Sequence, residues 1–273
     1  MRIGAFSFAP RRGDVEGNLA VVLDGLSEAS ATGCRLVVLP EMWTTSFAEF
    51  GDAGAARELC ERSESALDQV AAFTEQHDVV VAGTAPALRE DALPFNRLTL
   101  FARGQRLLDY DKLHLFTPTA EELNFSAGDL PPTCIEPEHT GLPPMTGATC
   151  YDLRFSETFK PAVRAGAELI VCPAQWPTPR IAHWRALLPG CAVEHQSFVV
   201  GCNRTGTELV GRRQLELVFP GHSMVVDPNG EILAEGGPET GLISAEVDFE
   251  LVRRLRTRVP IKKDRRDELY RSW

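Results

Sequence analysis

Long apolar stretches are absent from the sequence. No segment approaches the roughly 18 consecutive apolar residues that a membrane-spanning helix requires. The N-terminal segment reaches Arg11 and Arg12 before it can form the apolar core of a signal peptide. We therefore expect a soluble, cytoplasmic protein without a membrane partner.

Paired cysteine motifs are absent as well, although the sequence contains seven cysteines. Their number is odd, their spacing is irregular, and neither a CxxC pair nor a cluster of cysteine with histidine occurs. This pattern argues against a disulfide framework and against a structural zinc site. We expect mostly reduced thiols and no bound metal ion.

Basic residues are too few to favour nucleic acid as a partner. The 28 Lys+Arg against 38 Asp+Glu give a formal net charge of −10, which opposes binding to a polyphosphate backbone. One basic cluster near the end is interrupted by acidic and apolar residues; it comprises Arg253, Arg254, Arg256, Arg258, Lys262, Lys263, Arg265 and Arg266. A solvated helix face or a subunit contact is favoured there over a nucleic-acid site.

Linkers and internal repeats are lacking too. The chain of 273 residues, 44% of them hydrophobic, can bury roughly three quarters of the surface that its unfolded form exposes. No Gly/Ser-rich or charge-rich segment divides it. We predict a single domain over residues 1–273.

Short β-branched runs alternate with helical patterns in the first third of the chain. A strand at residues 3–8 precedes a helix that Asp14 can cap and Gly33 can end. An apolar strand at 35–40, a helix at 63–77 and an apolar run at 79–83 complete a βαβαβ order.

The remainder predicts a mixed sheet and then a second alternation. Residues 98–101 and 105–110 flank an Arg103-Gly104 turn and indicate a hairpin. Residues 116–144 are irregular, as functional segments often are. Strands are expected at 147–150, 168–172, 198–202, 222–226, 231–234 and 242–247, and helices at 156–165, 182–196 and from Phe249. We interpret the pattern as an α/β fold in which two mixed sheets lie between helices in four layers.

Three residues stand where they could carry chemistry. Glu41 follows the strand at 35–40, although an ordinary loop glutamate is also possible there. Lys112, in YDKLHLF, would share a face with Tyr110 and His114 if the strand continued, but a lone lysine in a strand is usually solvated. Cys150 lies at a strand-to-helix turn, where N–H groups and cations can favour a thiolate, although cysteines are commonly buried and inert.

Taken together, the strings LPEMW, YDKLHLF and CYDLRF, with HWRALLPGCAVEHQSFVVGCNRTG and GHSMVVDPNGEI, resemble the nitrilase superfamily of carbon-nitrogen hydrolases. The resemblance implies an α-β-β-α sandwich, a Glu41-Lys112-Cys150 triad, no cofactor, and self-association as a homodimer or larger assembly. It also implies a second glutamate, assigned to Glu121, with its neighbour Glu122 left open.

The resemblance implies a covalent mechanism. Glu41 would accept the proton of Cys150, and Lys112 with the backbone N–H of Tyr151 would hold the oxyanion. Departure of ammonia or an amine leaves a thioester, which water hydrolyses with Glu41 as base. His114 would have a supporting role at most.

The strings CYDLRF, QWPTPR followed by HW, and GCNR resemble the ω-amidase branch, whose members hydrolyse the terminal amide of dicarboxylic acid monoamides such as 2-oxoglutaramate. An arginine suits the distal carboxylate of such a substrate, and Arg154 and Arg180 are the candidates. Arg154 could instead pair with Asp152 or Glu157. Trp176 could form a wall of the pocket.

Other outcomes remain open from sequence alone. N-carbamoyl amidohydrolases and aliphatic nitrilases use the same triad, and a non-catalytic binding protein could retain the fold. Pro189 and Gly190 fall inside the helix expected at 182–196 and should bend or interrupt it. Because the resemblance implies a subunit contact there, the dimer interface could be altered.

Overall fold

The computed structural model describes residues 1–273 except 49, 51, 90–92, 211–214 and 271–273. Its larger sheet has the order β13-β1-β2-β3-β4-β5, in which β1, β2 and β3 are parallel and the other neighbours antiparallel. The strands are β1 (Arg2–Ser7), β2 (Cys34–Val38), β3 (Val80–Ala87), β4 (Phe95–Ala102), β5 (Gln105–Asp111) and β13 (Gly241–Glu246). The predicted hairpin is confirmed as β4–β5.

The second sheet has the order β12-β11-β8-β7-β6, with β6, β7 and β8 parallel. Its strands are β6 (Met145–Gly147), β7 (Leu169–Ala174), β8 (Phe198–Asn203), β11 (Met224–Val226) and β12 (Ile232–Glu235). A separate hairpin of β9 (Thr205–Val210) and β10 (Leu215–Pro220) was not predicted. Three of the six residues of β10 are exposed, so no run of core residues marks it in the sequence.

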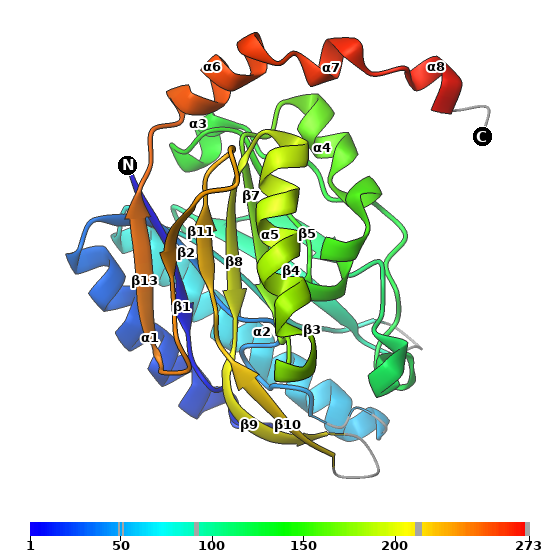
Figure 1. The fold of residues 1–273 in the computed structure, drawn as a ribbon. Coiled ribbons are helices and arrows are strands. Elements are labelled where there is room, and N and C mark those ends of the chain that lie inside the picture. The colour runs from blue at the N-terminus through cyan, green and yellow to red at the C-terminus, as the bar shows by residue number, and fades with distance from the viewer. Residues whose placement is uncertain (49, 51, 90–92, 211–214, 271–273) are drawn as a thin grey trace.

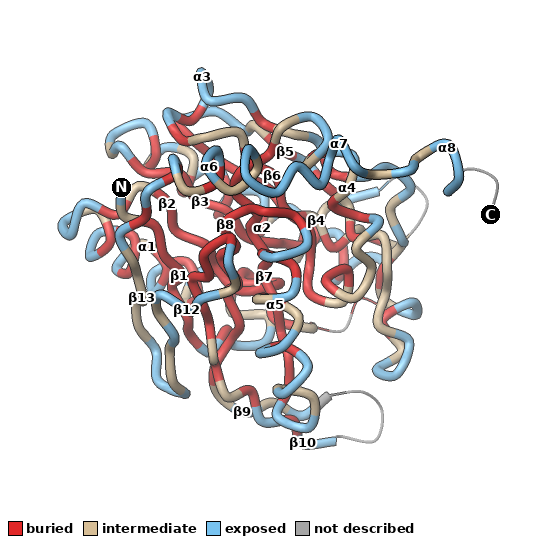
Figure 2. Tube along the Cα trace, turned by 45° about the horizontal axis from the view of Figure 1, so that its top comes forward, coloured by how far each residue is buried: buried red, intermediate tan, exposed pale blue. Residues whose placement is uncertain are grey.

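Four layers result, as predicted (Figure 1). Helices α1 (Val15–Ala31) and α2 (Ala53–Gln76) cover the larger sheet, and α5 (Ile181–His195) covers the second. The sheets face each other through side chains such as Leu36, Val38 and Val171, which are fully buried. Figure 2 shows this buried interior between helices that are largely exposed on their outer faces.

Capping residues set the helix starts. The Asp14 carboxylate accepts a hydrogen bond from Gly17 N at 3.1 Å and begins α1, as predicted. The second helix begins at Ala53, where Asp52 accepts from Ala55 N at 2.8 Å, rather than at residue 63. Its first turns contain few large apolar side chains, so the hydrophobic periodicity begins later than the helix.

Two predictions about the second half need correction. Helix α5 runs unbroken through Pro189, so the expected interruption does not occur. Proline removes one N–H donor, but Trp184, Leu188 and Ala192 are fully buried beneath the helix and hold it in place. The helix expected at 156–165 is divided into η4 (Ser156–Thr158) and α4 (Lys160–Ala165).

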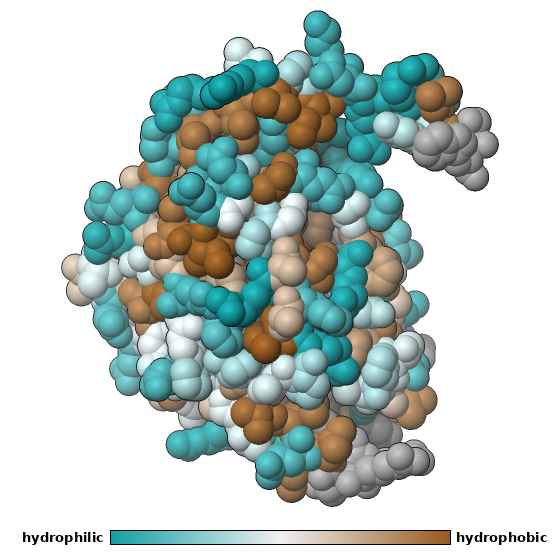
Figure 3. Space-filling model, viewed as in Figure 1, coloured by the Kyte–Doolittle hydropathy of each residue, from teal (hydrophilic) through white to brown (hydrophobic). Residues whose placement is uncertain are grey.

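The segment expected to be irregular contains only η1 (Thr117–Thr119), η2 (Glu121–Leu123) and α3 (Pro137–Thr140). At the other end of the chain, α6 (Glu250–Arg258), α7 (Ile261–Asp264) and α8 (Asp267–Tyr270) lie along the top of the molecule, where hydrophilic residues are prominent (Figures 1 and 3). Arg254 pairs with Asp248 at 2.9 Å, as on a solvated helix face. Within the described ranges, no helix is long and apolar enough to span a membrane.

Candidate active site

Loops at the strand ends bring the three predicted residues together between the sheets. Glu41 lies three residues after β2, and Lys112 directly follows β5 in the same sheet. Cys150 comes from the other sheet, where it begins η3 (Cys150–Arg154) after β6. Segments separated by 71 and 38 residues therefore meet at one place, because each strand ends at the same edge of the sandwich.

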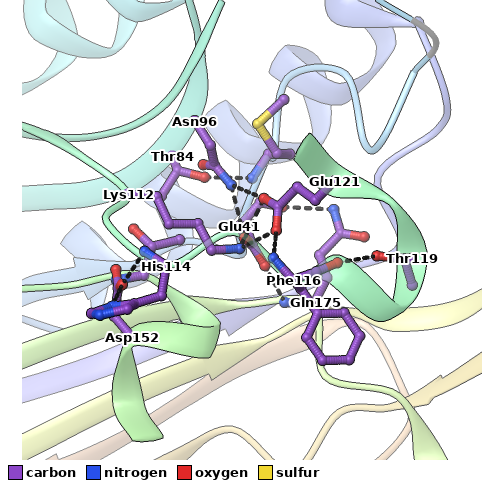
Figure 4. Close-up of polar contacts among 12 residues, drawn as sticks. Glu41, Thr84, Asn96, Lys112, His114, Phe116, Thr119, Glu121, Asp152 and Gln175 are labelled. Carbon is purple, nitrogen blue, oxygen red and sulfur yellow. Dashed lines mark hydrogen bonds and ion pairs between the residues drawn. The ribbon is translucent and has the colours of Figure 1, made fainter. Parts of the chain in front are cut away.

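Lys112 is clamped between two carboxylates (Figure 4). Its Nζ lies 2.8 Å from Glu41 Oε1 and 2.9 Å from both carboxylate oxygens of Glu121. All three side chains are buried. The alternative of a solvated strand lysine is therefore wrong, because β5 ends at Asp111 and the side chain of Lys112 turns inward.

Glu121, rather than Glu122, is the second glutamate that enters this cluster. Glu121 is buried, and its Oε2 also accepts a hydrogen bond from Phe116 N at 2.6 Å. Glu122 is exposed on η2. The structure therefore resolves the choice that the sequence left open, because only one of the two neighbouring side chains can point inward from this short helical turn.

Burial and mutual charge set the protonation of the cluster. Burial raises the pKa of Glu41 despite the nearby Lys112 ammonium, and the Glu121 carboxylate adds to the rise. Burial alone would lower the pKa of Lys112, but the charges of Glu121 and Glu41 more than offset this and raise it well above its usual value. Lys112 is therefore a permanent cation.

Cys150 has an unusual backbone conformation and a thiol whose pKa is raised. Its φ of +47° is left-handed, a conformation that costs a non-glycine residue about 1–3 kcal/mol and is frequent at functional sites. Burial, followed by the Glu41 charge, raises the pKa of the thiol well above its usual value, although Lys112 and the Gln175 N–H act in the opposite direction. Ionisation of this thiol therefore requires a base, which is the role expected of Glu41.

Asp152 connects the turn at Cys150 to the segment that contains Lys112. Its Oδ2 accepts from Tyr110 Oη at 2.8 Å and from Thr149 N at 3.1 Å, while Oδ1 accepts from His114 N at 3.0 Å. The His114 ring also contacts Oδ1 at 2.8 Å. His114 thus supports the site through Asp152, in line with the supporting role expected for it.

Sequence reasoning missed two polar residues beside the triad. Asn96 Nδ2 lies 2.8 Å from Glu41 Oε1 and 3.3 Å from Glu121 Oε1. Gln175 N donates to Glu41 Oε2 at 2.9 Å, and the Gln175 side chain is held by Arg204 at 2.9 Å. Gln175 directly follows β7, and this position at the end of a strand could have marked it as a candidate site residue. Asn96 lies within β4, and nothing in the sequence around it indicates a role in the site.

A small pocket of about 250 Å³ opens onto Cys150. It contains all four residues predicted to bind substrate, and its lining is Phe116, Cys150, Tyr151, Arg154, Gln175, Trp176, Pro177 and Arg180. Trp176 is buried and donates its indole N–H to Arg180 O at 2.7 Å. It therefore fixes the η5 turn (Thr178–Arg180) as well as forming a wall.

The two arginines of the pocket lie on aromatic faces. Arg154 Cζ is 4.8 Å from the Trp176 ring centroid, and Arg180 Cζ is 4.8 Å from that of Phe116. In the described part of the chain, neither guanidinium has a carboxylate within 4.0 Å. The ion pair proposed as the alternative for Arg154 does not form, because Asp152 bonds other groups and Glu157 pairs with Lys160 at 3.2 Å.

Among the residues that the structure describes, no group of three or more His, Cys, Asp and Glu side chains could hold a metal ion. The chemistry available at this site is that of a thiol, a carboxylate and an ammonium group around a small pocket. A sequence model described as carbon-nitrogen hydrolase matches residues 2–257. The chain belongs to the carbon-nitrogen hydrolase family.

Relatives of this family support the assignment along nearly the whole chain. The chain is 34% identical over 247 residues to 2-oxoglutaramate amidase of Bacillus subtilis (strain 168), with 89% of each protein covered. It is 34% identical over 243 residues to omega-amidase YafV of Escherichia coli (strain K12), with 89% of this chain and 88% of the relative covered. The predicted membership in the nitrilase superfamily is confirmed.

A solved structure agrees with the fold and with cysteine chemistry. The amidase from Nesterenkonia sp. AN1 superposes with a TM-score of 0.84 at 26% identity, covering 100% of this chain and 99% of that one. In that structure, a mutant with glutamate replaced by glutamine, acrylamide has added to the active-site cysteine. The chain described above is accordingly a carbon-nitrogen hydrolase with an α-β-β-α fold.

Proposed function

We propose that this carbon-nitrogen hydrolase is an amidase for the terminal amide of short dicarboxylic acid monoamides such as 2-oxoglutaramate. One observation carries the proposal. The pocket over Cys150 presents Arg154 and Arg180, and neither has a carboxylate partner among the described residues. A small amide with a distal carboxylate would supply that partner.

The first half of the proposed reaction begins with the Cys150 thiol and ionised Glu41. As sulfur attacks the amide carbon, Glu41 accepts the thiol proton, and the carbonyl oxygen becomes an oxyanion. Lys112 Nζ and the N–H of Tyr151, in the first turn of η3, supply its donors. Glu41 then passes its proton to the nitrogen, the C–N bond breaks, and ammonia leaves a thioester on Cys150.

In the second half, water attacks the thioester. Glu41 accepts a proton from this water, the second tetrahedral intermediate collapses, and the C–S bond breaks. The carboxylic acid leaves and the proton returns to sulfur. Glu121 keeps Lys112 in place during both halves, since it holds Nζ through two contacts of 2.9 Å. No cofactor is required, because these protein groups and water supply the nucleophiles and accept and return every proton in both halves of the reaction.

The proposed carboxylate recognition predicts a change in selectivity. Arg154→Met and Arg180→Met variants should be tested separately, and the one that removes the carboxylate ligand should lose about 10- to 100-fold in kcat/KM for 2-oxoglutaramate, mostly through KM. Butyramide, which has no carboxylate, should be affected less than about threefold. Ammonia release measures both rates. Arg185→Met is the matched control, since Arg185 lies on α5 and pairs with Glu235.

Equal losses for both amides, or no loss in either variant, would contradict carboxylate binding by these arginines. The same assay should include an N-carbamoyl amino acid and an aliphatic nitrile. Release of carbon dioxide together with ammonia would indicate a carbamoyl hydrolase instead, and turnover of the nitrile a nitrilase. The intact set of Glu41, Lys112, Glu121 and Cys150 argues against a non-catalytic binding protein.

General-base activation predicts selective alkylation of Cys150. Iodoacetamide should label Cys150 in the wild type faster than the five other buried thiols, and Glu41→Gln should reduce that rate by about 100-fold. Cys134 is less buried than the other cysteines, has no glutamate partner of this kind, and serves as an internal control. Peptide mass spectrometry follows each site. An unchanged Cys150 rate in the variant would exclude Glu41 as its base.

The proposal extends to the domain organisation, the assembly and the cellular location of the enzyme. We infer one domain over residues 1–273, supported by the match over 2–257 and by a core shared between the two sheets. The homodimer or larger assembly and the cytoplasmic location implied by the resemblance belong to the same proposal.

A further inference from the structure

Asn96 is the only described neutral side chain that donates to both buried glutamates of the site. Its Nδ2 lies 2.8 Å from Glu41 Oε1 and 3.3 Å from Glu121 Oε1. The same two oxygens accept from Lys112 Nζ at 2.8 Å and 2.9 Å. Two donors therefore bridge the same pair of acceptors, and Figure 4 shows the four groups converging.

The backbone of Asn96 reinforces this arrangement. Its carbonyl accepts a hydrogen bond from Lys112 N at 3.0 Å, where β4 and β5 lie side by side. The side chain that contacts the carboxylates and the backbone that holds the lysine thus belong to one residue. A shift of Asn96 would move the cation and both of its partners together.

The orientation of the Asn96 amide is fixed by charge. Reversing the amide would place Oδ1 against two carboxylate oxygens, which only accept hydrogen bonds. In the orientation observed, Oδ1 is buried and has no hydrogen-bond partner in the described part of the chain. An unsatisfied buried acceptor is unfavourable and requires an explanation. Here the contacts of Nδ2 with the two ionised groups provide it.

A neutral donor suits the chemistry of this position. Glu41 and Glu121 carry two negative charges and Lys112 one positive charge, so the cluster can still accept a proton from Cys150. A second cation at Asn96 would stabilise ionised Glu41 further and weaken it as a base. The amide adds hydrogen bonds without adding charge.

The other oxygen of Glu41 has a different environment. Oε2 accepts from Gln175 N at 2.9 Å, and this N–H also acts on the Cys150 thiol. Lys112 and Asn96 both contact Oε1, whereas Oε2 accepts from neither of them. We propose that Asn96 is a positioning residue, which together with Lys112 holds Oε1 of Glu41 so that Oε2 remains directed at Cys150. This inference rests on the base role proposed above for Glu41, but not on the identity of the substrate.

The test compares Asn96→Leu, which keeps a similar shape without donors, with Thr99→Val on the same strand. Thr99 is equally buried and contacts Asp109, outside the cluster. We expect Asn96→Leu to lower kcat for 2-oxoglutaramate by about 10- to 100-fold, with KM within about twofold, because the substrate does not contact Asn96. Thr99→Val should change kcat by less than about twofold.

A pH profile separates positioning from a merely structural role. Asn96 stabilises the ionised form of Glu41, so its loss should raise the pKa of that carboxyl. Activity falls as pH falls through this pKa, and the acidic limb of kcat/KM should therefore move to higher pH in Asn96→Leu. The alkylation rate of Cys150 by iodoacetamide should show the same displacement, and it requires no substrate.

The outcomes are distinguishable. A kcat within twofold of wild type, or a loss with the acidic limb unmoved, would overturn the role of Asn96. If wild type fails to hydrolyse ω-amides, the proposed substrate is wrong, while the alkylation profile still decides the inference. Should Asn96→Leu not fold, Asn96→Ser keeps one hydroxyl donor and should give the same displacement in smaller degree; an unmoved profile there would also overturn it.

Discussion

Replacing Cys150 by alanine will abolish amide hydrolysis and leave the fold intact. Without the sulfur no thioester forms, so ammonia release from 2-oxoglutaramate should fall by about 10⁴-fold or more. The wild type, quenched in acid during turnover, should show the mass of an acyl group on the peptide containing Cys150, and the variant should show none.

The matched control is Cys60→Ala. Cys60 is equally buried, but it lies in α2 on the outer layer, so its replacement should leave turnover within about twofold of wild type. Residual activity above about 1% in Cys150→Ala would remove this thiol from the mechanism. Thermal unfolding of both variants separates lost chemistry from lost structure.

Lys112→Met should damage activity and stability together. The change leaves the carboxylates of Glu41 and Glu121 buried without the cation that lies 2.8–2.9 Å from them. We expect kcat to fall by about 10³-fold or more. The variant loses a donor to the oxyanion, and it also loses the contact that holds the Glu41 carboxylate in position. The free energy of unfolding should decrease by about 3–5 kcal/mol, as for other broken buried pairs.

The destabilisation of Lys112→Met should depend on pH. Burial already raises the pKa of Glu41 in the folded protein, and loss of the Lys112 charge should raise it further. The stability that this group contributes is therefore present below its unfolded pKa and is lost as pH rises through the folded pKa. The difference from wild type should therefore be larger at pH 8 than at pH 5.5 in urea unfolding. Lys160→Met, at a partly exposed pair with Glu157, is the control. A difference that is small and independent of pH would contradict the buried ion cluster.

Much of this architecture could be predicted because local signals agreed with the fold. Asp14 caps α1 as expected, and Arg103 and Gly104 both have positive φ in the turn between β4 and β5. The strand ends after β2 and β5 locate Glu41 and Lys112. The first turns of α2 and the β9–β10 hairpin escaped because few buried apolar side chains mark them.

The remainder depends on contacts between segments distant in the sequence. Nothing in the string around Asn96 indicates that two glutamates, 55 residues before it and 25 after it, will accept its amide hydrogens. The raised pKa of the Cys150 thiol likewise follows from burial beside Glu41, which sequence position cannot give. The continuity of α5 through Pro189 is decided by the packing beneath it.

The origin of the reacting groups on opposite sheets gives this enzyme an inherent safeguard. Base and cation belong to one half of the sandwich, and the nucleophile with its Gln175 amide belongs to the other. Neither half holds the nucleophile together with its base, so in a nascent or partly unfolded chain Cys150 is an ordinary cysteine without Glu41 and Lys112 beside it. Amide cleavage therefore begins only when the two halves have docked, which ties catalysis to the completed native state.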